Sequence, residues 1–434
     1  MKKIVIIGNG IAGITAARHI RKFSNHQITV ISAESKYFFS RTALMYVYMG
    51  HMKWDHLKPY ENDFWAKNNI ELIQDVVVEV LPEKKQLKLK DNYLLGFDQL
   101  VVATGSKPNK FGWPGQDLSG VCGLYSKQDL EALEHFAPNN KVCQRAVIVG
   151  GGLIGIELAE MLRSRDIPVT MLVRETHFWN NVLPDEEASM LYNHIKSHHI
   201  DLRLKSNLDS IIDDGNGKVK AVKVKETGEI INCNYVGLTP GVSPNVSFLK
   251  DSGIRINKGI VVNDYLETNH KDIYAIGDCA EQEESKGNRP PIEAVWYTGR
   301  MMGEVVAQTI CENKTAYKPG NWFNSAKFLD IEYQTYGWVF NQPKHGDDDF
   351  YWKHPHENIC IHIHYEKSSR KFKGINAFGI RLRHEVMDRW LNESKSVDHV
   401  INNFSQANFD PEFYKDHTQQ IQHSFQKHQN KKAV

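Results

Sequence analysis

The sequence predicts an α/β protein in which two similar strand–turn–helix units are followed by a mixed α+β domain. Three observations predict this fold. A buried strand runs into a glycine-rich turn at 4–13, the same pattern returns at 146–155, and strand and helix patterns continue after about residue 318. The length of 434 residues exceeds what one hydrophobic core usually supports, so we expect two or three domains.

The composition limits the classes of function. Apolar residues make up 41% and charged residues 24%, and the net charge is +1, which is typical of a soluble globular protein and argues against a generally cationic, nucleic-acid-binding one. The apolar run at the N-terminus is too short for a signal peptide, and no later run approaches the ~20 apolar residues of a membrane span. We therefore expect a cytoplasmic protein with no nucleic-acid partner and no integral membrane segment.

The first unit contains every part of a dinucleotide-binding turn. A buried strand at 4–7 is followed by a helix pattern at 15–20. Between them stand three glycines at the spacing G-x-G-x-x-G: Gly8, Gly10 and Gly13. A second strand at 28–31 ends near Glu34, whose carboxylate is placed to accept hydrogen bonds from a ribose. The glycines let backbone N–H groups approach a pyrophosphate, and the helix N-terminus stabilises its charge.

The second unit repeats this pattern, with strands at 146–149 and 169–173 and a helix at 156–163. Its turn also holds three glycines: Gly150, Gly152 and Gly155. The repeat implies two dinucleotides, or one dinucleotide and a relic. Arg174 would pair with the 2′-phosphate of NADPH, whereas Glu175 would accept from the free hydroxyl of NADH. Both nucleotides therefore remain candidate ligands, and NADH is slightly favoured.

Two later stretches identify a family. An apolar strand in 98–109 ends in Ala-Thr-Gly, and a strand in 270–281 ends in Gly277-Asp278. With the two glycine units, they resemble the two-dinucleotide flavoproteins, the pyridine nucleotide:disulfide oxidoreductase superfamily, from residue 3 to about residue 340. The resemblance implies that the first Rossmann-like domain binds FAD, that the second binds NADH or NADPH, and that Asp278 lies at the ribityl chain of the flavin.

The resemblance and the motifs together assign the candidate site. The FAD-binding residues are expected to be Gly8, Gly10, Ala12, Gly13, Glu34, Ser40, Arg41, Val77, Thr104, Gly105, Asp278 and Glu293. The NAD(P)-binding residues are expected to be Gly150, Gly152, Ile154, Gly155, Glu157, Arg174, Glu175 and Gly241. Glu157 matches a family glutamate near the nicotinamide, although a helix-surface carboxylate is the alternative. We assign no side chain as an essential acid or base, because hydride chemistry belongs to the cofactors.

The cysteines separate the branches of the superfamily. The six cysteines lie far apart in sequence, without a Cys-x-x-Cys pair. Where thiol-dependent members place a redox cysteine after the first unit, this chain has Ser40 and Arg41. The stretch at 36–50 instead resembles the cysteine-free ferredoxin, rubredoxin and putidaredoxin reductases. It departs from them at Met45-Tyr46, near where those proteins carry a lysine.

The sequence from residue 289 onward predicts further helices and strands. Prolines and apolar spacing in 289–310 indicate a helix that starts at the prolines. Past residue 318 we expect strands, an amphipathic helix at 385–404 and a frayed polar tail at 416–434. The histidines of this region favour polar strand residues over a metal site, and we expect no metal: His354, His356, His362 and His364.

These inferences combine into one functional prediction. We expect an FAD-binding domain at 1–112 and 240–317, an NAD(P)H-binding domain at 113–239 and a C-terminal α+β interface domain at 318–434. The protein would pass hydride from NAD(P)H to FAD and electrons to a separate acceptor, a small redox protein such as a ferredoxin or rubredoxin. The alternatives are an NAD(P)H:quinone or small-molecule reductase of the same fold and a redox-sensing interaction module. The sequence leaves open whether the protein forms a homodimer.

Overall fold

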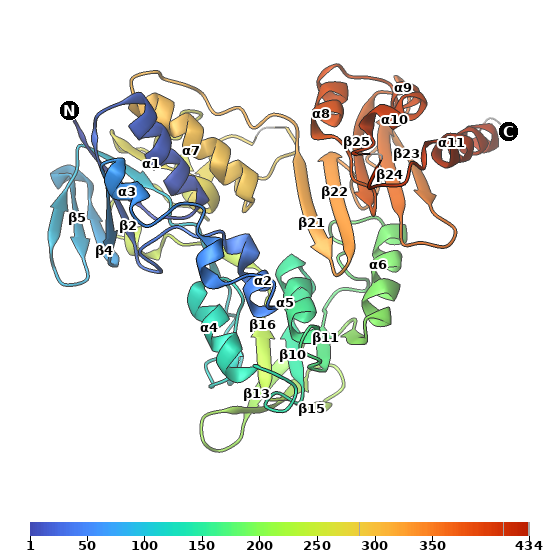
Figure 1. Cartoon of the computed structure of the whole chain (residues 1–434), viewed down its shortest axis with the longest axis horizontal. Coiled ribbons are helices and arrows are strands. Elements are labelled where there is room, and N and C mark those ends of the chain that lie inside the picture. Colours follow the sequence, from blue (N-terminus) through green and yellow to red (C-terminus); the bar gives the residue numbers. More distant parts are fainter. Residues whose placement is uncertain (286, 411, 433–434) are drawn as a thin grey trace. The chain divides into compact units, whose positions relative to one another are not determined.

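The computed structural model describes residues 1–285, 287–410 and 412–432, and the chain divides into two compact units (Figure 1). Unit 1 comprises Met1–Phe111, Cys122–His135 and Gly241–Pro319. Unit 2 comprises Gly112–Val121, Phe136–Pro240 and the chain from Gly320 onward. Residues 122–135, which the sequence analysis assigns to the NAD(P)H-binding domain, thus cluster with unit 1. The division into three domains stays a prediction.

A parallel sheet forms the core of unit 1, with the strand order β19-β7-β1-β2-β3. Its strands are β1 (Lys3–Ile7), β2 (Gln27–Ser32), β3 (Ile70–Gln74), β7 (Gln99–Val102) and β19 (Ile273–Ala275). Ile4 pairs with Ile28 on one side and with Gln99 on the other. The apolar run of β1 is buried because helices cover parallel sheets on both faces. The α/β fold predicted from the sequence is confirmed.

Helices α1 (Ile11–Phe23) and α7 (Trp296–Ile310) lie side by side in unit 1 (Figure 1). Gly303 makes this approach close: a Cβ at this position would stand 2.5 Å from the carbonyl oxygen of Ala12 and 2.9 Å from Cβ of Thr15. The predicted helix start at the prolines is wrong, since α7 begins at Trp296. The carbonyl of Pro291 instead accepts a hydrogen bond from the backbone N–H of Gln282, 2.8 Å away, which holds this segment outside the helix.

The other elements of unit 1 are short. The strands are β4 (Val77–Leu81), β5 (Gln86–Leu89), β6 (Leu94–Gly96), β8 (Ser106–Pro108), β17 (Val242–Pro244), β18 (Ile260–Val262) and β20 (Ala280–Gln282). The helices are α2 (Leu44–Tyr48), α3 (Phe64–Lys67) and α4 (Lys127–Phe136), the last of which ends at the boundary with unit 2. The 3-10 turns are η1 (Arg41–Ala43), η2 (Trp54–Leu57), η3 (Pro82–Lys84), η4 (Ser247–Leu249) and η5 (Gly277–Cys279).

Unit 2 contains a second sheet, with the order β12-β11-β10-β16-β9. Its strands are β9 (Val121–Cys122), β10 (Ala146–Val149), β11 (Val169–Leu172), β12 (Ile200–Arg203) and β16 (Tyr235–Leu238). The glycine turn after β10 leads into α5 (Leu153–Arg163), and α6 (Asp185–Ser197) precedes β12. A small antiparallel sheet adds β13 (Leu208–Asp213), β14 (Val219–Val224) and β15 (Ile230–Asn232). As in unit 1, the strand before the glycine turn pairs in parallel with strands on both sides.

The C-terminal part of unit 2 is an antiparallel sheet with the order β21-β22-β25-β24-β23. Its strands are β21 (Phe323–Phe328), β22 (Ile331–Gly337), β23 (Asp347–Lys353), β24 (Cys360–Glu366) and β25 (Phe372–Phe378). Its helices are α8 (His384–Asn392), α9 (Val397–Asn402), α10 (Phe404–Ala407) and α11 (Thr418–Lys432). The described residues include no helix whose length and apolar character would let it cross a membrane.

Two expectations for this region are wrong. The predicted helix at 385–404 is divided into α8, α9 and α10, because Ser394 has a φ of 51° and the side chain of Ser396 caps α9. The predicted frayed tail forms α11, whose Ile421 and Phe425 are buried in the C-terminal core. These two residues are four apart, so they lie on one face of the helix. Ala433 and Val434 lie outside the described residues.

Buried polar side chains connect α6 with the C-terminal sheet. Nδ2 of Asn376 donates to Oε2 of Glu187 at 2.9 Å, and the imidazole of His362 lies 3.0 Å from Asp349 and 4.0 Å from Oε1 of Glu187. Burial raises the pKa of Glu187 to about 7, although His362 and Asn376 lower it in part. His362 and His364 lie on β24, as the prediction of polar strand residues expects, and both are buried, at 2% and 1% exposed.

The first prediction concerns the contact between α1 and α7. Gly303→Val should lower the free energy of unfolding by about 2 kcal/mol or more, because the backbone of α1 leaves no room for the side chain. Arg300→Val is the matched control, since it places the same residue on the exposed face of α7 and should cost only about 0.7 kcal/mol of helix propensity. Urea unfolding followed by circular dichroism measures both. Equal midpoints for the two variants would contradict the close packing.

The second prediction concerns pH. A carboxyl group whose pKa is raised by folding stabilises the protein below its unfolded pKa, and this contribution is lost as the pH rises through the folded value. The pKa of Glu187 is raised to about 7. The free energy of unfolding of wild type should therefore fall by about 2 kcal/mol relative to that of Glu187→Gln between about pH 5 and about pH 8. Urea midpoints measured across this range test the prediction. Glu186→Gln changes the exposed neighbour, and its urea midpoint should depend on pH as that of wild type does. If the urea midpoints of wild type and Glu187→Gln change in parallel with pH, the raised pKa of Glu187 is refuted.

Candidate functional site

The turn between β1 and α1 uses its three glycines in different ways. Gly8 has a φ of +109°, and a Cβ there would stand 2.1 Å from the carbonyl oxygen of Ala103. A Cβ at Gly13 would stand 2.0 Å from the carbonyl oxygen of Gly8. Both positions therefore require glycine for packing. A Cβ at Gly10 would point into open space, so protein packing does not explain the glycine at this position.

The turn between β10 and α5 repeats this division. Gly150 has a φ of +127°, and its Cβ would stand 2.3 Å from the carbonyl oxygen of Thr239. A Cβ at Gly155 would stand 2.6 Å from the carbonyl oxygen of Gly150, whereas one at Gly152 would point into open space. The two units thus share a turn whose outer glycines are needed for packing and whose middle glycine leaves the backbone accessible.

The middle glycines also begin the helices. Gly10 is the N-cap of α1 and Gly152 is the N-cap of α5, both with extended backbone. A glycine has no side-chain oxygen to accept from the first N–H groups of the helix, which are left for solvent or a ligand. These N–H groups and the helix dipole make an anion-binding site. The residues of both turns therefore fit the pyrophosphate of a dinucleotide.

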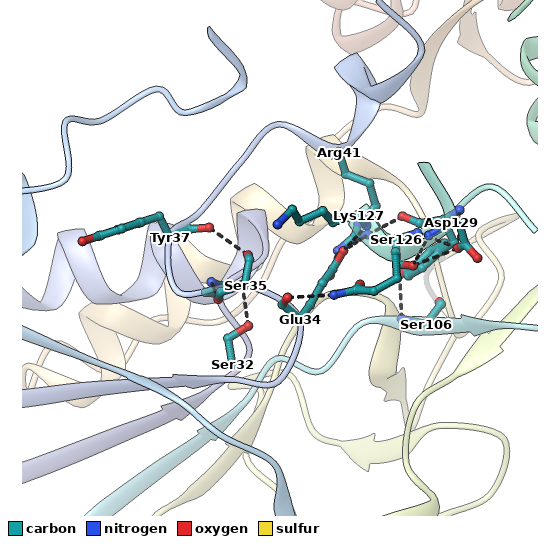
Figure 2. Close-up of polar contacts among 12 residues, drawn as sticks. Ser32, Glu34, Ser35, Tyr37, Arg41, Ser106, Ser126, Lys127 and Asp129 are labelled. Carbon is teal, nitrogen blue, oxygen red and sulfur yellow. Dashed lines mark hydrogen bonds and ion pairs between the residues drawn. The ribbon is translucent and has the colours of Figure 1, made fainter. Parts of the chain in front are cut away.

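Glu34 lies just past β2 and takes part in an ion pair with Arg41 (Figure 2). Its Oε1 accepts from Nη1 of Arg41 at 3.0 Å and from the backbone N–H of Lys127 at 2.8 Å, and its Oε2 accepts from Nη2 of Arg41 at 2.5 Å. The structure thus brings together two predicted site residues that are seven apart in sequence. A carboxylate has about four lone-pair sites, so Glu34 retains capacity for a hydroxyl donor.

The segment at 125–129 completes this network, and the sequence analysis missed it. The guanidinium of Arg41 lies 4.5 Å from the ring centroid of Tyr125 and donates to the backbone carbonyl of the same residue. Oδ2 of Asp129 accepts from the backbone N–H groups of Tyr125 and Ser126 at 2.9 and 2.8 Å, which fixes the start of α4. The segment follows an ordinary helix pattern in the sequence, and only the tertiary structure brings it to Glu34.

Asp278 lies in the η5 turn that follows β19 and approaches the same region through Ser106. Oγ of Ser106 donates to Oδ2 of Asp278 at 3.0 Å, and the backbone N–H of Ser106 donates to the hydroxyl of Tyr125 at 3.1 Å. Burial raises the pKa of Asp278, although the hydrogen bond from Ser106 and the charge of Arg41 lower it in part. Thr104 and Gly105 lie directly before Ser106, and Oγ1 of Thr104 donates to the carbonyl of Asn245 at 2.7 Å.

The other residues predicted to bind FAD have different surroundings. Ala12 is buried in α1, against η5. Oγ of Ser40 lies 3.3 Å from Oγ1 of Thr42, and Val77 is buried at the start of β4. Glu293 is also buried, and its carboxylate accepts from Arg289 and from Thr298 at 2.7 Å each. In the described chain, Val77 and Glu293 share no hydrogen bond or ion pair with the Glu34–Arg41 network.

The residues predicted to bind NAD(P) lie mainly in unit 2. Ile154 and Glu157 are half-buried on the first turns of α5. Burial raises the pKa of Glu157 to about 7, with a smaller contribution from the negative charge of Glu160. Arg174 and Glu175 form an ion pair, with 2.8 Å between Nε and Oε1. The cation that favours NADPH is thus paired with the carboxylate that favours NADH.

Gly241 differs from the other residues predicted to bind NAD(P) because it belongs to unit 1. Its φ is +102°, and its carbonyl accepts from the backbone N–H of Asn109 at 3.0 Å. Gly241 therefore stands where the chain returns to unit 1, directly before β17. Its contact with a nicotinamide nucleotide stays a prediction.

The cysteine thiols are poor nucleophiles. Burial raises the pKa of every one of them, to about 11 for Cys122 and Cys143 and to about 12 for Cys233. The thiolate is the reactive form of cysteine, so these side chains are unreactive near neutral pH. This agrees with the positions of Ser40 and Arg41, where thiol-dependent relatives would carry a redox cysteine.

Known proteins share both the sequence pattern and the fold. The chain is 28% identical over 284 residues to the assimilatory nitrate reductase electron transfer subunit of Bacillus subtilis, which covers 64% of this chain and 36% of that protein. It is 29% identical over 316 residues to the NADH-rubredoxin oxidoreductase of Clostridium acetobutylicum, covering 73% of this chain and 76% of that protein. The chain spans about a third of the length of the first two curated relatives.

A solved structure extends the likeness over nearly the whole chain. The NAD-dependent persulfide reductase from A. fulgidus superposes with a TM-score of 0.86 at 24% identity, covering 99% of this chain and 83% of that chain. At this identity the likeness shows the fold. The family model of pyridine nucleotide-disulphide oxidoreductases matches residues 2–307. Its members are FAD-dependent and use NADH or NADPH, which bears out the cofactors predicted from the family resemblance. The chain therefore belongs to the pyridine nucleotide-disulphide oxidoreductase family.

Proposed function

We propose that this protein is an FAD-dependent NAD(P)H oxidoreductase that passes electrons to a separate small redox protein. The observation that carries the proposal is the shared design of the two turns, in which Gly10 and Gly152 each leave a helix N-terminus open to a pyrophosphate. One open turn is expected to hold FAD and the other NADH or NADPH. When bound, FAD accepts hydride from the nucleotide and supplies electrons to an acceptor.

The chain's own residues would bind and orient the cofactors. Glu34 would accept from ribose hydroxyls with the lone pairs that Arg41 and Lys127 leave, and Asp278 would accept from hydroxyls of the ribityl chain. Because Glu175 neutralises Arg174, the second turn is expected to favour NADH over NADPH. A half-buried Glu157, whose pKa is raised to about 7, would lie close to the nicotinamide and be partly protonated near pH 7.

The chemistry of the thiols supports an external acceptor. An internal dithiol acceptor needs at least one thiolate of low pKa, whereas burial raises the pKa of every cysteine here. The names of two relatives agree with this proposal, since one is an electron transfer subunit and the other is an NADH-rubredoxin oxidoreductase. The cytoplasmic location and a homodimer stay predictions.

The third prediction separates the two turns. Gly10→Val should lower the FAD content of the purified protein more than about tenfold, because the new side chain occupies the open space at the pyrophosphate site. Gly152→Val should retain FAD but lose fast flavin bleaching by NADH, while dithionite still reduces the flavin. Absorbance of the bound flavin and anaerobic stopped-flow mixing with NADH and with NADPH measure these effects.

The control for both variants is Gly96→Val at the exposed end of β6, where a Cβ meets a single described atom at 3.9 Å. This variant should behave as wild type. If Gly10→Val keeps its FAD, or if Gly152→Val is reduced by NADH as fast as wild type, the corresponding turn does not hold the nucleotide assigned to it.

The fourth prediction concerns the acceptor. With NADH as donor, a rubredoxin or ferredoxin should be reduced with a kcat/KM at least about tenfold above that for a soluble quinone, because a docking surface raises the rate of productive encounter. Steady-state assays with each acceptor at equal concentration test this. Faster turnover with the quinone would favour a small-molecule reductase, and slow turnover with every acceptor would favour a redox-sensing role.

A further inference from the structure

Two histidines on α6 face the same direction. His194 lies in the last turn of the helix and His198 is its C-cap, so the two are four residues apart and their ring centroids are separated by 4.6 Å. The side chain of His194 is 6% exposed and that of His198 is 36% exposed. Such a pair offers two imidazole nitrogens on one helix face, with access to solvent on one side.

The turn between β21 and β22 supplies a carboxylate to this pair. Leu329 and Asp330 connect the two strands, and Leu329 has a φ of 58°, a conformation that is rare for a bulky residue. Its side chain is only 4% exposed, so burial in the core stabilises the turn and leaves Asp330 at the tip. Oδ1 of Asp330 lies 2.7 Å from Nε2 of His194 and 3.2 Å from Nε2 of His198.

The three donor atoms form a compact N, N, O set. They all lie within 4.8 Å of one another, and the two N···O distances of 2.7 and 3.2 Å compare with ~3.3 Å between donors around a tetrahedral zinc ion. Nε2 of His194 is buried and makes no hydrogen bond of suitable direction within the described part of the chain, although the carboxylate is near.

An amide side chain contacts the ring of His194 on its other side. Nδ2 of Asn358 lies 3.2 Å from Nδ1 of His194, and Nε2 is the ring nitrogen that faces Asp330.

We propose that His194, His198 and Asp330 bind a divalent transition-metal ion, zinc by preference, with water at the fourth position. Imidazole and carboxylate ligands suit zinc, and the exposed side chain of Asp330 leaves a path for the ion and for water. The ion would connect α6, which follows the second glycine unit in the chain, to the β21–β22 turn of the C-terminal sheet. Its ligands are not residues of the cofactor turns, and the proposal does not depend on the proposed function.

The fifth prediction is that the untagged holoprotein binds about one zinc ion per chain through these residues. The protein is stripped with EDTA, dialysed, loaded with zinc and passed over a desalting column, and its zinc content is measured by mass spectrometry. A chromogenic chelator gives the affinity by competition. His198→Gln and Asp330→Asn should each weaken zinc binding more than about 100-fold, because each removes a ligand and leaves two.

His199→Asn is the matched control, since His199 is the exposed neighbour of His198 and its φ of 59° suits asparagine. This variant should bind zinc as wild type does. Zinc should also raise the thermal midpoint of wild type by ~5 °C and leave that of His198→Gln unchanged. The proposal is overturned if wild type retains no zinc, or if His198→Gln retains as much zinc with the same affinity as wild type.

Discussion

The lack of room for a Cβ at the outer glycines is the constraint on which both nucleotide turns depend. At Gly8 and Gly150, the backbone of the residue that directly follows the neighbouring strand occupies the place where a side chain would stand. At Gly13 and Gly155, the preceding turn of the chain does so. Because no side chain stands between them, the start of each helix packs closely against its sheet. The helix N-terminus is therefore held at the carboxyl end of the central strand, where ligands bind in open α/β sheets.

Side chains from distant segments build the rest of the first site on this frame. Arg41 follows the first glycine unit, and Tyr125 lies just before α4. Asp278 follows β19, the last strand of the unit 1 sheet along the chain. Hydrogen bonds join them through Ser106 and Glu34. The buried part of this network is polar, so each member depends on its partners to remain satisfied. The network thus positions the groups that would contact the flavin nucleotide.

The parts of the fold that follow a local pattern were predictable from the sequence. The strands before the glycine turns and the helices after them have the expected periodicity and lie where it places them. The segment at 125–129, the cluster at Glu187 and the group at Asp330 were not predictable, because each depends on residues brought together by tertiary packing. The helix in the tail at 416–434 was not predictable from its polar composition, although two apolar residues lie on one face of it, Ile421 and Phe425.

The segmented composition of unit 1 affects how the chain assembles during synthesis. The edge strand β19 and the helix α7 come from residues after 270, yet they pack on β7 and α1 near the start of the chain. Until β19 and α7 leave the ribosome, one edge of β7 and one face of α1 have no packing partner. Residues of unit 2 from Phe136 to Pro240 emerge earlier and can complete their own sheet around β10. Unit 1 is thus expected to close only after the sheet around β10 has formed, and to need protection from aggregation until then.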